Sequence, residues 1–270
     1  MMKTRIRAKT RTRLGLCLTW LCLLFLFLPM LVVIPVSVTD KAYLSLPTDG
    51  MSWQHYQGLL DPEKGWTTSF LNSLATAICA AILATALAAT FAIGAWIRSG
   101  WWPSTIRVLM LSPLIVPPII YAVGMVKLLS RLSMLDSFLG VLIVHVILAL
   151  PMAFLSIVAS LSNLDNRMVM AARNLGARPA TIYTGVILPN ILPGLAAAGF
   201  LSFITSWDEI TVTLFITARR FVTLPRRIFT SIADNIDPAL AAIASVLLVV
   251  TTAALVAKLF FGKSEGPASR

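Results

Sequence analysis

Six long stretches of this sequence contain almost no charged side chain, and they constrain its fold more than any other feature. Five of them contain no Asp, Glu, Lys or Arg: residues 14–39, 69–97, 108–126, 137–164 and 239–257. The sixth lies between Pro189 and Ala218 and holds only Asp208 and Glu209. A helix of about 20 apolar residues crosses ~30 Å of hydrocarbon, so each stretch is long enough to span a membrane. The pattern predicts an all-α integral membrane protein with six transmembrane helices.

Composition supports this class, because 58% of the residues are hydrophobic and only 12% are charged. We expect one membrane domain over residues 14–261, preceded by a basic tail at 1–13 and followed by a short tail at 262–270. The net charge of +11 does not indicate a nucleic-acid partner, since no aromatic side chains are interleaved with the basic ones.

Basic residues instead indicate how the chain is oriented in the bilayer. Six of the first 13 residues are Lys or Arg, and they immediately precede the first apolar stretch. Cytoplasmic segments are enriched in such residues, so the N-terminus is predicted inside, and six spans then place the C-terminus inside as well. The first stretch is too long for the apolar region of a signal peptide, and no small-residue cleavage site follows it. We therefore expect a retained first span.

Proline is concentrated in the third predicted span, at about 106–128. Pro113, Pro117 and Pro118 all fall within it. Each proline removes a backbone donor and frees carbonyls that need partners in lipid, so this span is predicted to be kinked against protein or a cavity.

The sequence contains none of the usual catalytic or metal-binding patterns. It has no HExxH, no GxSxG and no Cys/His pairing at a useful spacing. Its cysteines, Cys17, Cys22 and Cys79, lie inside predicted spans and are expected to pack as small apolar residues. We therefore predict no metal, no cofactor and no enzymatic activity, and any energy for the protein's work must come from a partner.

The polar loop 161–190, between the fourth and fifth predicted spans, has the local features of two short helices. Asp165 suits an N-cap, Gly176 suits the residue that ends a helix, and Pro179 suits the first turn of another. A solvated connector that only sets topology would also account for the loop. Alternatively, small apolar side chains at Ala171 and Ala172, together with Leu175, would form a face that a partner can approach closely.

This loop resembles the cytoplasmic coupling motif of the membrane subunits of bacterial ABC importers, written E-A-A-x3-G-x9-I-x-L-P. The matching residues are Met170, Ala171, Ala172, Gly176, Val186, Leu188 and Pro189, with Leu175 and Ala177 beside the glycine. Met170 stands where the family usually has Glu, and Val186 where it usually has Ile. The resemblance implies a short cytoplasmic helix that seats in a groove of a separate ATPase.

Two carboxylates inside the fifth predicted span, Asp208 and Glu209, are the next candidates for function. An ionisable group in a span costs roughly 2.5–3.5 kcal/mol even on a lenient insertion scale, so it usually faces protein or water. At 3.6 residues per turn, a polar stripe runs along one face of this helix and comprises Ser202, Thr205, Ser206, Glu209, Thr213 and Thr217. The two carboxylates either line a solute path or hydrogen-bond to neighbouring helices. A lone histidine, His145 in the fourth span, is open to the same two interpretations.

The segment from Ser206 to Glu209, with Thr223-Leu224-Pro225 after it and His145 six residues before Pro151, resembles permeases of spermidine/putrescine-type importers. The resemblance implies a multi-pass subunit of a type I ABC importer in a bacterial inner membrane. It also implies a second permease that forms a heterodimer with this one, two cytoplasmic ATPase subunits and an extracytoplasmic solute-binding protein.

An acidic pair in the passage would suit a polyamine, so we expect a polyamine as solute. Relatives in the same class carry other small solutes, and an opine, an amino-acid derivative or a phosphonate is the alternative. A non-transporting membrane assembly protein is the rival from another class, although the docking motif argues against it.

Overall fold

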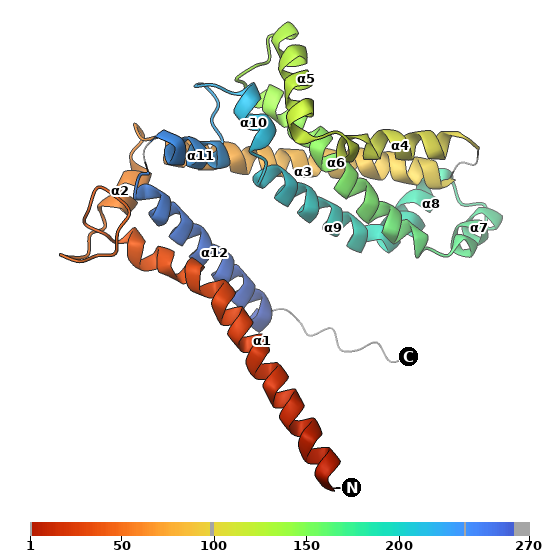
Figure 1. Ribbon diagram of the computed structural model, residues 1–270. Coiled ribbons are helices and arrows are strands. Elements are labelled where there is room, and N and C mark those ends of the chain that lie inside the picture. Colours follow the sequence, from red (N-terminus) through yellow and green to blue (C-terminus); the bar gives the residue numbers. More distant parts are fainter. Residues whose placement is uncertain (1, 98–99, 235, 262–270) are drawn as a thin grey trace. The chain divides into compact units, whose positions relative to one another are not determined.

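The computed structural model describes residues 2–97, 100–234 and 236–261 (Figure 1). Within these ranges the chain is helical or irregular, and its only β-type pairing is an isolated bridge between Thr39 and Met51. The all-α prediction is therefore confirmed. The predicted tail 262–270 lies outside the described residues.

The helical segments have the following bounds in chain order: α1 (Met2–Ser37), α2 (Gln54–Leu60), α3 (Trp66–Ile97), α4 (Trp102–Ile115), α5 (Pro118–Arg131), α6 (Phe138–Ser162), α7 (Asn166–Asn174), α8 (Pro179–Ile182), the π-helical segment η1 (Tyr183–Ile187), α9 (Leu188–Trp207), α10 (Thr211–Ile216), α11 (Leu224–Asp234) and α12 (Ala239–Phe261).

Five helical segments of the described chain are long and apolar enough to cross a membrane. They are Gly15–Ser37, Trp66–Ile97, Phe138–Ser162, Pro179–Trp207 and Ala239–Lys258. A sixth span is formed only if α4 and α5 are counted together, because these two helices meet at an angle of 104°. The prediction of six apolar segments is thus met by five helical segments that are each long enough and one broken pair.

The break between α4 and α5 is sharper than the kink that the sequence predicted, and prolines explain it. Pro117 has φ −55° and ψ 135°, an extended conformation that no helix continues through. Its ring also disfavours the helical region for Val116, which is extended with ψ 124°. Because Pro117 and Pro118 both lack an N–H, the helical hydrogen-bond ladder cannot cross this point.

The chain forms two compact units, residues 1–67 with 230–270 and residues 68–229. In the first unit α1 and α12 pack side by side (Figure 1), and the Ser245 hydroxyl donates to the Val33 carbonyl oxygen at 3.3 Å. Helix α1 begins at Met2, so residues 2–13 of the predicted basic tail are helical.

The second unit is built on the close packing of α6 against α9 (Figure 1). A Cβ added at Gly194 of α9 would lie 2.3 Å from the Cβ of Ser160 on α6, so the absence of a side chain allows this approach. Buried apolar side chains from α3, α6 and α9 surround the contact, including Phe154, Ile157 and Ile191. The segment α7–η1 connects α6 to α9 at one end of the pair, and α10 continues from α9 at the other.

Candidate functional site

Helix α7 occupies the predicted coupling loop, and both of its ends are closed as the sequence predicted. The Asp165 carboxylate accepts the backbone N–H of Arg167 at 2.9 Å, which makes Asp165 the N-cap. Gly176 has φ +77° and ends the helix. Its N–H bonds to the Arg173 carbonyl at 2.9 Å, and the Ala177 N–H bonds to the Ala172 carbonyl at 3.0 Å. These two bonds form a Schellman motif, so the carbonyls at the helix end are satisfied within the chain.

The candidate coupling residues divide between the core and solvent. Val169 of α7 is buried, and Ala172 and Ala177 pack against the α6–α9 core from its edge. By contrast, Met170 and Ala171 are exposed, and Leu175 is 88% exposed. The described structure thus leaves a large apolar side chain, next to the helix-ending glycine, available for a partner.

The connection from α8 into α9 contains a feature that the sequence analysis missed. Residues Tyr183–Ile187 form a π-helical turn, in which the Leu188 N–H bonds to the Tyr183 carbonyl five residues back. The next residue is Pro189, which has no N–H with which to restore the regular ladder. Leu188 is half-buried and Pro189 is exposed at the start of α9. The Leu-Pro pair of the motif therefore marks the exact place where the π-turn becomes an α-helix.

At the other end of α9 the predicted polar stripe is wrong in one respect, because it assumed a single helix from 191 to 216. Helix α9 ends at Trp207, Asp208 is its C-cap, and α10 begins at Thr211. The Glu209 carboxylate accepts the Val212 N–H at 2.7 Å and so caps α10. Four β-branched residues in succession from Ile210 to Thr213 also have low helix propensity, which favours a break here.

His145 contacts two of the remaining members of that stripe, Ser206 and Thr213. Its Nδ1 lies 2.8 Å from the Ser206 hydroxyl of α9, and its Nε2 lies 3.0 Å from the Thr213 hydroxyl of α10. All three side chains are buried, with His145 only 1% exposed. In a neutral imidazole one nitrogen donates and the other accepts, and either hydroxyl can take the complementary role. His145 thus connects α6 to both halves of the broken fifth span. Thr205, the other hydroxyl among the candidate residues, bonds to the Leu201 carbonyl of its own helix at 2.9 Å.

Comparison with known proteins identifies this architecture. A family model described as the inner membrane component of binding-protein-dependent transport systems matches residues 81–263. The chain belongs to this family. It is a permease subunit of type I ABC importers, a transport component that is not itself catalytic, and ATP hydrolysis takes place in a separate subunit.

Three relatives of this permease illustrate the range of solutes in the family. The chain is 28% identical to the spermidine/putrescine transport system permease of Haemophilus influenzae over 85% of its own length and 88% of the relative's. It is 26% identical to the putrescine transport system permease of Escherichia coli over 82% and 80%. It is also 27% identical to the molybdenum transport system permease of Mycobacterium tuberculosis over 85% and 92%.

A solved structure agrees with the fold of the permease. The chain resembles a chain from the crystal structure of a bacterial ABC transporter involved in the import of the acidic polysaccharide alginate, with a TM-score of 0.69. The match covers 96% of this chain and 97% of the other, at 15% sequence identity. This likeness shows the fold alone.

The permease also has an aromatic cluster that sequence analysis did not single out. Trp207, beside the acidic pair, stacks on Phe203 with ring centroids 5.8 Å apart and meets the edge of Phe70 at 5.7 Å. Phe203 and Trp207 lie four residues apart on α9, so their spacing alone predicts that the two rings share a face. Phe70 comes from α3, so no spacing in the sequence predicts its contact with Trp207.

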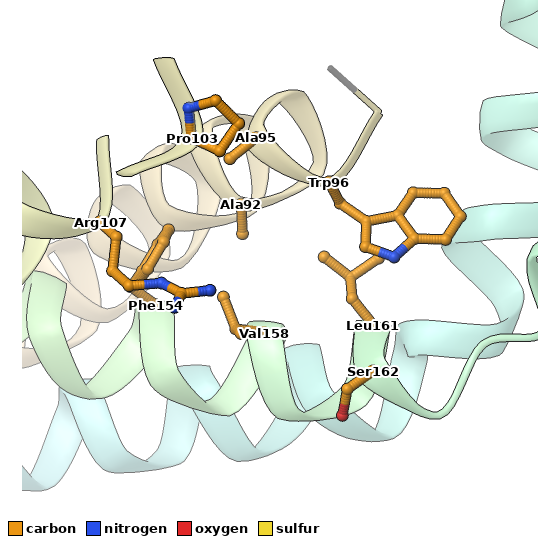
Figure 2. Close-up of a pocket in the computed structure, with 9 residues that line it drawn as sticks. All are labelled: Ala92, Ala95, Trp96, Pro103, Arg107, Phe154, Val158, Leu161 and Ser162. Atoms are coloured by element: carbon orange, nitrogen blue, oxygen red, sulfur yellow. The ribbon is translucent and has the colours of Figure 1, made fainter. Parts of the chain in front are cut away.

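At the coupling end of the same unit lies a cavity of about 410 Å³ between α3, α4 and α6 (Figure 2). Its walls are mostly apolar, and Figure 2 shows the Arg107 guanidinium extending into it between Phe154 and Val158. Among the described residues that line it, Arg107 is the only charged one, and none of them is acidic.

Proposed function

We propose that this permease forms one half of the path for a small organic cation, with a polyamine of the spermidine/putrescine type as the expected solute. The observation that carries the proposal is the acidic pair at the end of α9. Asp208 is exposed, and Glu209 is half-buried. Neither carboxylate forms an ion pair with another described side chain. Their negative charge is therefore available to offset the cost of taking a cation out of water.

The two carboxylates differ in what they already bind. Glu209 caps α10 through the Val212 N–H, whereas the side chain of Asp208 makes no hydrogen bond to the described part of the chain. Asp208 is thus the better candidate for direct contact with a solute, and Glu209 for setting the position of α10. Trp207 precedes Asp208 in the sequence and stacks on Phe203. Its ring adds an aromatic face that an ammonium group or an alkyl stem can contact.

The same pair argues against the anionic solutes within the family's range. A molybdate or phosphonate would meet two like charges that no described cation neutralises. An opine or an amino-acid derivative that carries an ammonium group fits less completely, because its carboxylate would also approach Asp208. A non-transporting assembly protein would have no need of a carboxylate pair in the bilayer.

The partners we propose follow from the two ends of the second unit. The exposed Leu175 and Met170 would seat in a groove of a cytoplasmic ATPase. In this proposal loop 161–190 and both termini are cytoplasmic. A second permease, two ATPases and an external solute-binding protein would complete the importer. ATP-driven closure of the ATPases would then move α7, and α6 and α9 would transmit the movement towards the acidic pair.

The test is uptake of radiolabelled spermidine by the complete importer in proteoliposomes. Asp208→Asn and Glu209→Gln remove the charge and keep the size of each side chain. We expect at least one of them to reduce uptake about tenfold, equivalent to about 1.4 kcal/mol, without reducing assembly of the complex. Glu63→Gln is the matched control, since Glu63 is exposed in another loop. Normal uptake in both single variants and in the double variant would contradict a cation path here.

A further inference from the structure

The segment that follows α10, comprising a loop and the start of α11, carries an unusual number of positive charges for its proposed position outside the membrane. Arg219, Arg220, Arg226 and Arg227 all lie within nine residues. Arginine is normally depleted in external loops, because the topology of a membrane protein depends on keeping it inside. These four residues therefore work against the expected orientation, and a physical use for them is needed.

The structure separates the four arginines into two pairs. Arg226 donates to the Thr217 hydroxyl, and Arg227 Nε donates to the Ser69 hydroxyl of α3 at 2.7 Å. This pair is half-buried and holds α11 to its neighbours. Arg219 and Arg220 are exposed, and their side chains have no hydrogen bond or ion pair with any described residue. Among the described residues, only the side chains of Arg226 and Arg227 therefore hold parts of the fold together.

The backbone under the exposed pair is fixed by one carboxylate. Asp136, in the turn between α5 and α6, accepts four consecutive backbone N–H groups from the loop. Its Oδ1 accepts from Ala218 at 2.8 Å and from Phe221 at 3.1 Å, and its Oδ2 accepts from Arg219 and Arg220, both at 2.9 Å. The Asp136 N–H in turn donates to the Ile216 carbonyl at 2.9 Å. We call these five bonds the Asp136 clamp.

In the clamp, the Asp136 carboxylate accepts hydrogen bonds from the backbone rather than from the arginine side chains. Burial raises the pKa of Asp136, but the N–H groups of Ala218, Arg220, Arg219 and Phe221 outweigh this effect and hold the pKa well below its usual range. The carboxylate therefore remains ionised at any physiological pH. With all four acceptor positions filled by N–H groups, Asp136 has none left to accept from the guanidinium of Arg219 or Arg220.

We infer that Arg219 and Arg220 form a docking surface for an acidic patch on the solute-binding protein, and that Asp136 is the positioning residue for this surface. The inference rests on the proposed function, which places this end of the permease outside. A loop with a fixed backbone loses less conformational entropy on docking than a mobile one, so the clamp improves the affinity of whatever the arginines bind. Opposite charges across an interface also speed the encounter of the two proteins.

The clamp also connects the docking surface to the proposed solute path. The loop begins directly after α10, and α10 is held to α6 by the Thr213–His145 hydrogen bond. Force applied to the loop by a docked protein therefore reaches α10 and the Glu209 cap through a short run of bonded residues. A binding protein seated on this surface would sit next to the segment that must move for its solute to enter.

The experiment uses the complete importer in nanodiscs and titrates its ATPase activity with the solute-binding protein. Arg219→Gln/Arg220→Gln should raise the half-maximal concentration of binding protein about five- to tenfold, as expected for the loss of two partly exposed ion pairs. The maximal ATPase rate and the yield of the complex should not change. Raising NaCl from 50 to 500 mM should weaken the wild type much more than this variant, because salt screens the lost attraction.

Asp136→Asn tests positioning separately from charge. An amide replaces one acceptor oxygen by a donor, so at most two of the four loop bonds remain while both arginines are still present. This variant should raise the half-maximal concentration to a similar degree, and adding the arginine substitutions should raise it little further. A purely structural role would instead lower the yield and the maximal rate, and the two effects would add.

Arg131→Gln is the matched control, since it removes an exposed positive charge from the end of α5 without touching the clamped loop. If this control raised the half-maximal concentration equally, the attraction would come from the general positive charge of the surface rather than from a positioned pair, and the inference would be overturned. An unchanged half-maximal concentration in the double arginine variant would overturn it as well. If the wild type itself showed no stimulation at any concentration of binding protein, the proposed function would fail, and the inference with it.

Discussion

The buried His145 bridge is expected to be a structural connection, and its strength can be calculated approximately from its two hydrogen bonds. His145→Leu keeps much of the side-chain volume and removes the bonds to Ser206 and Thr213. Hydrogen bonds between transmembrane helices average about 0.6 kcal/mol and reach about 1.7 kcal/mol, so the loss of two should lower the free energy of unfolding by about 1–3 kcal/mol. Thr213→Val alone should cost about half as much.

The measurement is reversible unfolding of the purified permease in mixed micelles, read as a double-mutant cycle. With His145→Leu and Thr213→Val, the coupling energy should be about 0.6–1.7 kcal/mol. Thr251→Val is the control, because the Thr251 hydroxyl bonds only to carbonyls within its own helix. A coupling energy near zero would refute the bridge. A raised KM for uptake with unchanged stability would show instead that His145 contacts the solute.

Substitutions at two glycines, Gly176 and Gly194, test the coupling segment and the α6–α9 contact. Gly176→Val should cost roughly 1–2 kcal/mol at a φ of +77° and reduce ATPase co-purification severalfold, whereas Gly176→Asn should retain most of it because Asn tolerates this conformation. Gly194→Ala should lower the free energy of unfolding by about 1–3 kcal/mol through its clash with Ser160, and Ser160→Gly should restore part of the loss. Gly185→Ala, where a Cβ meets nothing within 4 Å, is the control for both, and a loss there of similar size would contradict the steric argument.

The spans could be predicted because each depends on one local property, the absence of charge over a membrane's thickness. The ends of α7 and the start of α8 could be predicted for a related reason, because they also depend on local properties. Asp165, Gly176 and Pro179 act through backbone groups within three residues of themselves, so the sequence alone indicates their roles. Hydropathy and capping are both short-range effects, and for this chain they are sufficient to predict the long apolar helices and the two ends of α7.

The broken fifth span was harder to predict, because hydropathy does not detect a break that leaves both halves apolar. Residues 191–216 have the composition of one span, and only Asp208 and Glu209 interrupt it. Their charge was visible, but the sequence could not show that Glu209 serves as a cap. The periodicity argument nevertheless grouped Ser206 with Thr213 correctly, since the turn between α9 and α10 returns both to the same partner, His145.

The Asp136 clamp shows why an important part of this end of the permease could not be predicted at all. Its donors are backbone N–H groups, which every residue except proline possesses, so residues 218–221 need no particular side chains to form it. The acceptor lies 82–85 residues away in the sequence. In the sequence Asp136 is one acidic residue in a short turn, and Arg219 and Arg220 are an exception to the distribution of charge. Only the fold brings the two together, and it turns an apparent violation of the topology rule into a rigid, positively charged surface whose partner can be tested.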